Sequence, residues 1–156
     1  MNEVTGQFAV FTMGGEEFAL GVGRIVEILQ RQDCMPLPNM PDFLIGVIEL
    51  RGRVIPVMDL RMRFGLKPAA KSKERIIVIR KGRERLAVLV DDVSEIIALG
   101  ETQVTPPPSI FKGIGAVYME GIARLGKRMI VVFNVDRLLS TVEMDQMKDA
   151  LRGGIA

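Results

Sequence analysis

The stretch GVIELRGRVIPVMDLRMRF, residues 46–64, consists of two short apolar runs joined by the dipeptide Arg51-Gly52. A glycine at the second position of a two-residue loop supplies the positive φ that a tight hairpin turn requires. The turn also fixes the register of the two strands, which places Ile48 opposite Ile55. The stretch therefore predicts a β-hairpin with the shortest kind of connection.

The same pattern occurs a second time in the chain. A shift of 75 residues lays 46–62 onto 121–137, where the turn dipeptide is Gly126-Lys127. A shift of 68 residues lays 8–29 onto 76–97 without a gap. Two blocks that repeat in the same order, with turns in the same places, indicate an internal duplication.

Many short apolar runs, closely spaced and separated by glycine turns, predict a mostly β fold. Small closed barrels are a common way to avoid exposed strand edges. We therefore expect two barrels, one per half, with approximate bounds 8–66 and 75–139. We also allow for terminal strands that cross over between the halves.

Two capping signals predict helices. Asp59 is suited to cap a single helical turn that Gly65 ends. Ser140 and Glu143 form a capping box, which predicts a C-terminal helix over 140–152 that stops at the following glycine. The apolar stripe that should pack this helix on a barrel consists of Met144, Met147 and Leu151.

The composition narrows the possible classes of protein. The chain has 156 residues, of which 48% are hydrophobic, yet no apolar run approaches the roughly 20 residues of a membrane span. The N-terminus lacks a basic segment followed by an apolar one, so we expect a cytoplasmic protein with no direct membrane insertion. With one cysteine and no histidine, the usual zinc and haem ligand sets are missing, and we expect no metal and no cofactor.

No set of residues assembles an active site in the sequence. The segment 121–128 resembles a phosphate-binding loop, but Arg128 stands where that loop needs Ser or Thr. Asp91 and Asp92 lack further oxygen ligands at loop spacing, so they are interpreted as a turn or strand end. The four serines have no histidine to activate them. These observations favour binding over catalysis, so the protein is not expected to be an enzyme.

The charge is unevenly distributed. Residues 51–85 hold 12 Lys and Arg against three acidic residues, although the net charge of the chain is only +2. Such a segment can be a docking surface for an acidic partner or a phosphate backbone, or simply a solvated surface. An alternative function is therefore that of a small β-barrel nucleic-acid-binding protein. Nucleic-acid platforms interleave aromatic with basic residues, however, and this segment contains only one aromatic residue, Phe64.

With these elements assembled, the chain resembles the CheW family of chemotaxis coupling proteins. The matching segments are FAVFTMGGEEFALGV, RIVEI from Arg24, residues 43–64 with their L-R-G, LAVLVDDVSEII from Leu86, and GIARLGKRMIVVFNVDRLL. The resemblance implies a single CheW-like domain over 1–156, built of two small SH3-like five-stranded barrels. It also implies a non-catalytic adaptor that couples the cytoplasmic tips of chemoreceptors to the regulatory domain of the histidine kinase CheA. Such a protein is cytoplasmic and is recruited to chemoreceptor arrays at the inner membrane.

Site residues follow from the same resemblance by matching positions. It implies that Ile25, Glu27 and Arg51 bind the receptor, and that Gly46, Arg51 and Gly52 bind the kinase. Strand alternation predicts that Ile25 and Glu27 share one exposed face. The turn itself does not call for arginine, which suggests a binding role for Arg51.

Each of these residues also has a structural interpretation. Ile25 can belong to the core, and Glu27 can be a solvated strand residue. The two glycines can be required by backbone geometry alone.

Overall fold

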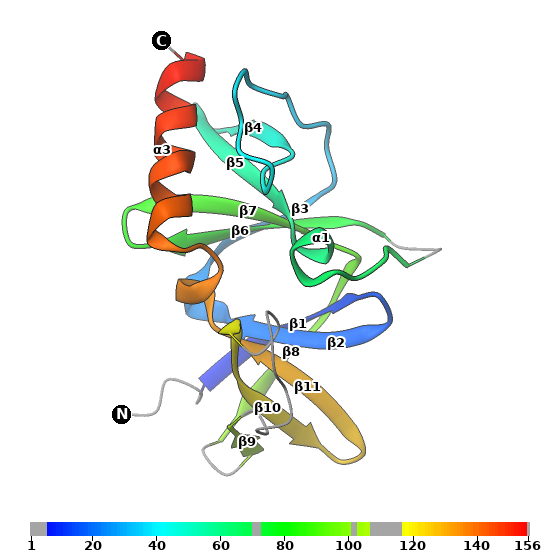
Figure 1. Cartoon of the computed structure of the whole chain (residues 1–156). Helices are drawn as coiled ribbons and strands as arrows, with labels where there is room; N and C mark the ends of the chain where they lie inside the picture. Colours follow the sequence, from blue (N-terminus) through cyan, green and yellow to red (C-terminus); the bar gives the residue numbers. More distant parts are fainter. Residues whose placement is uncertain (1–5, 70–72, 101–102, 107–116, 156) are drawn as a thin grey trace.

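The computed structural model describes residues 6–69, 73–100, 103–106 and 117–155. It consists of two curved β-sheets, one above the other in Figure 1, with a C-terminal helix along the upper one. The fold is mostly β, with two small barrels packed together, as predicted.

The lower sheet has the strand order β8-β1-β2-β11-β10-β9. Its neighbouring strands are antiparallel except for the parallel pair β2 and β11. The strands are β1 (Gly6–Met13), β2 (Glu16–Gly21), β8 (Asp92–Leu99), β9 (Val104–Thr105), β10 (Met119–Leu125) and β11 (Arg128–Phe133).

The upper sheet has the order β3-β6-β7-β5-β4, and its one parallel pair is β5 with β7. The strands are β3 (Ile25–Gln30), β4 (Gly46–Leu50), β5 (Arg53–Asp59), β6 (Arg75–Lys81) and β7 (Glu84–Val90). The helical elements that lie wholly within the described residues are η1 (Val22–Arg24), α1 (Leu60–Phe64), η3 (Val135–Arg137) and α3 (Thr141–Ile155).

The two sheets do not coincide with the two halves of the sequence. The strands of the upper sheet all lie within 25–90, whereas the lower sheet combines strands from 6–21 and 92–133. The approximate barrel bounds 8–66 and 75–139 are therefore corrected. The cause is an exchange of strands: β2 pairs with β11 of the second half, and β7 pairs with β5 of the first.

The exchange follows the sequence repeat. Ala19 pairs with Val132 in the lower sheet, and their repeat equivalents Ala87 and Val57 pair in the upper sheet. The two-residue strand β9, which brings the lower sheet to six strands, also has an equivalent. It corresponds to the isolated bridge between Met35 and Val47 in the upper sheet. The internal duplication is thus visible in the strand pairing.

The hairpin of β4 and β5 has the predicted register, with Ile48 opposite Ile55. Arg51 and Gly52 both have positive φ, 52° and 80°, as a two-residue turn of this hand requires. Gly46 allows strand β4 to lie close to the segment that follows β3. A Cβ on Gly46 would lie 2.7 Å from the Cβ of Cys34.

The predicted helix caps are also present. The Asp59 side chain accepts a hydrogen bond from the Arg61 N–H, and Gly65 ends α1 with a φ of 70°. In the capping box, Ser140 N–H donates to Glu143 at 2.9 Å and Glu143 N–H donates to Ser140 Oγ at 3.1 Å. The helix continues to Ile155 rather than stopping at 152, because the glycines of its last turn adopt the helical conformation.

Within the described part of the chain, three apolar clusters hold the fold together. One lies within the lower sheet around Val10 and Ile130, and another lies within the upper sheet around Val78 and Leu89. The third and largest packs the two sheets against each other and includes the buried Met147 of α3. Its stacked and tilted aromatic rings belong to Phe11, Phe18, Phe64, Tyr118 and Phe133.

Within the described residues, no helix is long and apolar enough to cross a bilayer.

Candidate docking surface

Two of the predicted site residues form an ion pair in the structure. Arg51 Nη2 lies 2.9 Å from Glu27 Oε1, and the side chains are 76% and 24% exposed. Glu27 belongs to β3 and Arg51 to the β4–β5 turn, so the pair joins the two opposite edges of the upper sheet. It therefore helps to close this barrel.

The turn itself does not call for arginine, but Arg51 has a partner within the chain, Glu27, which the sequence did not indicate. The ion pair is still largely open to water, which leaves the remaining N–H groups of the Arg51 guanidinium available at the surface. The turn holds the backbone of Arg51 in the left-handed region of φ and ψ, where residues other than Gly, Asn and Asp are uncommon. Arginine here thus has a backbone cost that Asn would largely avoid.

The prediction that Ile25 and Glu27 share a face is wrong as well. The pairing of β3 with β6 contains a bulge, so that Ile25 lies opposite Ile79 and Glu27 lies opposite Val78. Directly opposed residues share a face, and Ile79 and Val78 belong to different clusters. Ile25 therefore packs against the cluster between the sheets, while Glu27 lies on the opposite face. One extra residue in a strand reverses its alternation from that point.

A further isoleucine of β3 lies on the same face as Ile25. Ile28 is opposite Ile77, a member of the cluster between the sheets, and is 40% exposed. Ile25 itself is only partly buried at the edge of that cluster. Strand β3 thus presents two apolar side chains, one half-buried and one exposed.

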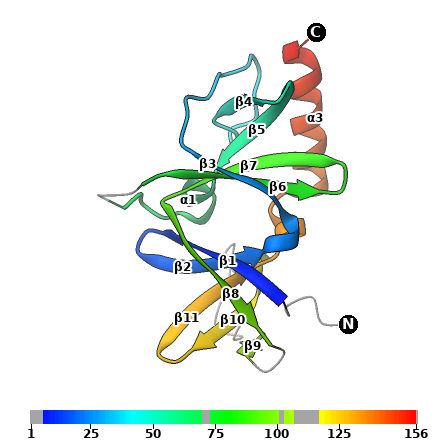
Figure 2. The same ribbon diagram turned by 180° about the vertical axis from the view of Figure 1, so that it is seen from behind.

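The edge strand of the lower sheet repeats this arrangement. Val93 and Ile96 of β8 are the equivalents of Ile25 and Ile28 under the 68-residue shift. Val93 packs against the same central cluster, and Ile96 is 61% exposed. Strands β3 and β8 both run across the side of the molecule seen in Figure 2. We call Ile25, Ile28, Val93 and Ile96 the edge-strand surface.

Sequence reasoning missed Ile28, Val93 and Ile96, although the repeat contained the signal. Transferring Ile25 by 68 residues would have given Val93 directly. Ile28 and Ile96, by contrast, resemble ordinary alternating core residues, so their exposure became evident only from the packing.

The two glycines of the predicted kinase site differ in their surroundings. Gly46 is buried beneath the Cys34–Met35 segment, and the carbonyl oxygen of Met35 would lie 3.0 Å from an added Cβ. Gly52 lies exposed in the turn, with open space where a side chain would extend. Gly46 therefore shapes strand β4 from inside, whereas Gly52 and Arg51 form its outer tip.

An ion pair also links separate strands of the lower sheet, as the pair of Glu27 and Arg51 does in the upper sheet. Glu95, the repeat equivalent of Glu27, lies 2.5 Å from the Arg128 guanidinium beside the β10–β11 turn. Arg128 also contacts Glu17 at 2.7 Å, and this hydrogen bond lowers the pKa of Glu17. Each barrel thus pairs a glutamate after its bulge with an arginine at its hairpin.

Not all of the basic segment 51–85 is a solvated surface. Arg61 is buried and contacts Asp59 at 3.0 Å, Glu74 at 2.7 Å and Asp91 at 2.8 Å. Burial opposes the charge of Arg61, but the hydrogen bonds to the three carboxylates outweigh it and raise its pKa. These contacts are internal, so Arg61 is not part of a docking surface.

Arg63 is directed inward as well. It pairs with Glu143 of the α3 capping box, and its guanidinium lies over the rings of Phe43 and Tyr118 at 5.8 and 5.5 Å. The Arg63 hydrogen bond lowers the pKa of Glu143. This contact joins α1 to the start of α3.

The chain is similar to known proteins over most of its length. A family model for the CheW-like domain matches residues 7–143. The chain is 31% identical to the chemotaxis protein CheW of Klebsiella aerogenes over 144 residues, which cover 91% of this chain and 87% of that protein. It is 28% identical to CheW of Treponema pallidum, with 94% and 89% covered. Among solved structures, the scaffolding protein TtCheW from Thermoanaerobacter tengcongensis matches with a TM-score of 0.79 at 31% identity, covering 90% of this chain and 91% of that one.

Proposed function

The chain belongs to the CheW family of chemotaxis scaffold proteins, and we propose that it couples the cytoplasmic tips of chemoreceptors to the histidine kinase CheA. The family is one of adaptors rather than of enzymes. The observation that carries the proposal is the family match over nearly the whole chain, together with an exposed apolar surface on two edge strands. In this proposal, recruitment to receptor arrays at the inner membrane follows from binding the receptors.

The proposed receptor contact combines the edge-strand surface with the ion pair of Glu27 and Arg51, which extends from the other face of β3. Ile28 and Ile96 are exposed apolar side chains of the kind that anchor interfaces, and each shares its strand with a half-buried residue, Ile25 or Val93. A receptor tip is a helical hairpin, whose apolar side chains can pack on such a surface. The proposed receptor-binding residues are thus Ile25, Glu27 and Arg51, as predicted from the sequence. To these we add the residues of β8 in the edge-strand surface, Val93 and Ile96.

The proposed kinase contact is the outer tip of the first hairpin, at Arg51 and Gly52, with Gly46 supporting it from within. Arg51 is then shared by both partners. Beyond its contact with Glu27, the exposed guanidinium offers further N–H groups to a carboxylate of either partner.

Binding of a receptor cytoplasmic fragment tests the receptor contact. Ile96→Asp places a charge on an exposed position, so folding should be preserved while binding falls at least tenfold. Val142→Asp is a matched control, because Val142 is equally exposed, at 65% against 61%, but lies on α3. Isothermal titration calorimetry of both variants gives the comparison. If Ile96→Asp binds as tightly as Val142→Asp does, the edge-strand surface is not the receptor contact.

A further inference from the structure

The strands of the described chain pass between the two sheets at two points only. The first crossing leads from β2 to β3 and contains η1 with Arg24. The second leads from β7 to β8 and contains Asp91. Both crossings carry a charged side chain that is bound to groups belonging to both sheets.

At the second crossing, Asp91 is the bridging residue. Its Oδ1 accepts a hydrogen bond from Arg61 of α1, which directly follows β5 of the upper sheet. Its Oδ2 accepts from the Gly14 N–H, in the β1–β2 turn of the lower sheet, at 2.8 Å. The side chains of Arg61 and Asp91 are only 3% and 2% exposed.

At the first crossing, Arg24 is the bridging residue. It contacts Asp136 of η3, which follows β11 of the lower sheet, at 2.5 and 3.2 Å. Its Nε also donates to the carbonyl of Arg80 in the upper sheet at 3.1 Å. This pair is open to water, with side chains 36% and 56% exposed, and Arg24 lowers the pKa of Asp136.

The two pairs are related by the duplication with their charges exchanged. Asp136 is the equivalent of Arg61 under the 75-residue shift, and each follows a capping side chain, Asn134 or Asp59. The bridging residues Arg24 and Asp91 lie within one position of equivalence under the 68-residue shift. One pair therefore places the cation after the strand and the anion at the crossing, and the other pair does the reverse. We call the pairs Arg61–Asp91 and Arg24–Asp136 the crossover pairs.

Each crossing leads directly into one strand of the edge-strand surface. Arg24 precedes β3 with Ile25, and Asp91 comes one residue before β8 with Val93. A contact that bridges both sheets at these points restrains where β3 lies relative to β8.

We propose that the crossover pairs position the two halves of the edge-strand surface, with Arg24–Asp136 as the adjustable contact and Arg61–Asp91 as the fixed one. The difference in exposure gives these roles. A solvated ion pair contributes little and is easily exchanged for water, whereas a buried one is strongly restrained by its desolvated partners. Arg24 and Asp136 are thus positioning residues, and their effect on receptor binding rests on the function proposed above.

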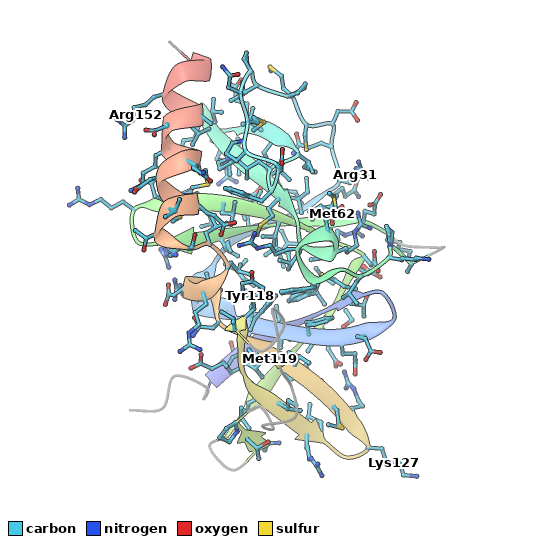
Figure 3. The ribbon with its side chains drawn as sticks, viewed as in Figure 1. Arg31, Met62, Tyr118, Met119, Lys127 and Arg152 are labelled. Carbon is cyan, nitrogen blue, oxygen red and sulfur yellow. The ribbon has the colours of Figure 1, made fainter. Side chains whose placement is uncertain are left out.

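A distance measurement tests the positioning without any partner. Spin labels are attached to Arg83→Cys and Lys127→Cys in a Cys34→Ser background. These positions are exposed tips of the β6–β7 and β10–β11 hairpins, and Lys127 extends away from its sheet in Figure 3. In Asp136→Arg, which opposes two cations, the distance distribution should broaden or shift. An unchanged distribution would overturn the proposal.

The exchanged pair Arg24→Asp with Asp136→Arg is the matched control. It restores an ion pair at the first crossing with the polarity that the chain already uses at the second, but Arg24→Asp removes the donor to the Arg80 carbonyl, so the distribution should return part of the way to that of the parent. If Asp136→Arg changes the distance distribution and the double variant reverses none of that change, the charge pair is not the restraint.

Receptor-fragment binding gives the functional readout. Asp136→Arg should weaken binding about three- to fivefold, the scale expected for an exposed pair, with little change in Tm, and the swap should recover part of the loss. Altered distances with unaltered binding would refute the link to docking. If the parent does not bind the fragment at all, the proposed function fails, while the distance measurement still decides the positioning.

Discussion

Replacing Arg51 by asparagine separates the contribution of this residue to folding from its contribution to docking. The variant loses the ion pair with Glu27, which is worth under about 1 kcal/mol because the Arg51 side chain is 76% exposed. It recovers part of the roughly 1–2 kcal/mol that a left-handed φ costs, because the φ of position 51 is 52° and asparagine tolerates this region better than arginine. The two effects are of similar size and opposite sign. The free energy of unfolding should therefore stay within about 1 kcal/mol of the parent in a urea titration.

Docking should respond differently. If Arg51 pairs with a partner carboxylate in a desolvated interface, its truncation costs roughly 2–5 kcal/mol, or at least about tenfold in assembly. Arg51→Lys should recover only part of this loss, since the planar fork is missing. Arg53→Asn, an exposed arginine across the same turn, removes the same charge and serves as the control. The assay is CheA autophosphorylation in a reconstituted complex with receptor fragment. Full activation by Arg51→Asn would show that Arg51 is merely a solvated turn residue.

Other perturbations test the framework. Arg61→Met leaves Asp91 buried without its cation, so unfolding by urea should require about 3–5 kcal/mol less, and a loss under about 1 kcal/mol would contradict the buried network. Gly46→Ala sets a Cβ 2.7 Å from a neighbouring Cβ and should cost about 1–3 kcal/mol in the same titration; a neutral effect would mean that the Cys34–Met35 segment yields freely. The folded-state pKa of Glu143 lies below its unfolded value of about 4.3 because of Arg63, so its stabilisation is present at pH 7 and is lost as pH falls through the folded pKa. The stability advantage of the parent over Glu143→Gln should accordingly shrink below about pH 4, and a pH-independent difference would refute the assignment.

Local signals in the sequence were sufficient for the local structure. The two-residue loop at Arg51-Gly52 determines the register of β4 and β5, and the cap at Asp59 determines the start of α1. Both depend on interactions within a few residues of the chain, so a short stretch contains all the information. The repeat added a longer-range prediction, the barrel pair.

What could not be predicted depends on contacts between distant segments. The exchange of β2 and β7 between the halves requires knowing which of two equivalent partners each strand pairs with, and the repeat makes both partners look alike. The bulge in β3 has no marker in the sequence, so alternation assigned Glu27 to the wrong face. The contact of Glu27 with Arg51 follows from closure of the barrel rather than from either residue alone.

If this chain joins receptor to kinase, it should raise the activity of the kinase only when both partners are present, and one titration measures this. Increasing amounts of the protein are added to a fixed mixture of CheA and receptor cytoplasmic fragment, and the rate of CheA autophosphorylation is measured. We expect the rate to rise with the protein in the presence of both partners and not to rise when the receptor fragment is left out. A rate that stays at the level of the kinase and receptor alone, at every concentration of the protein, would contradict it.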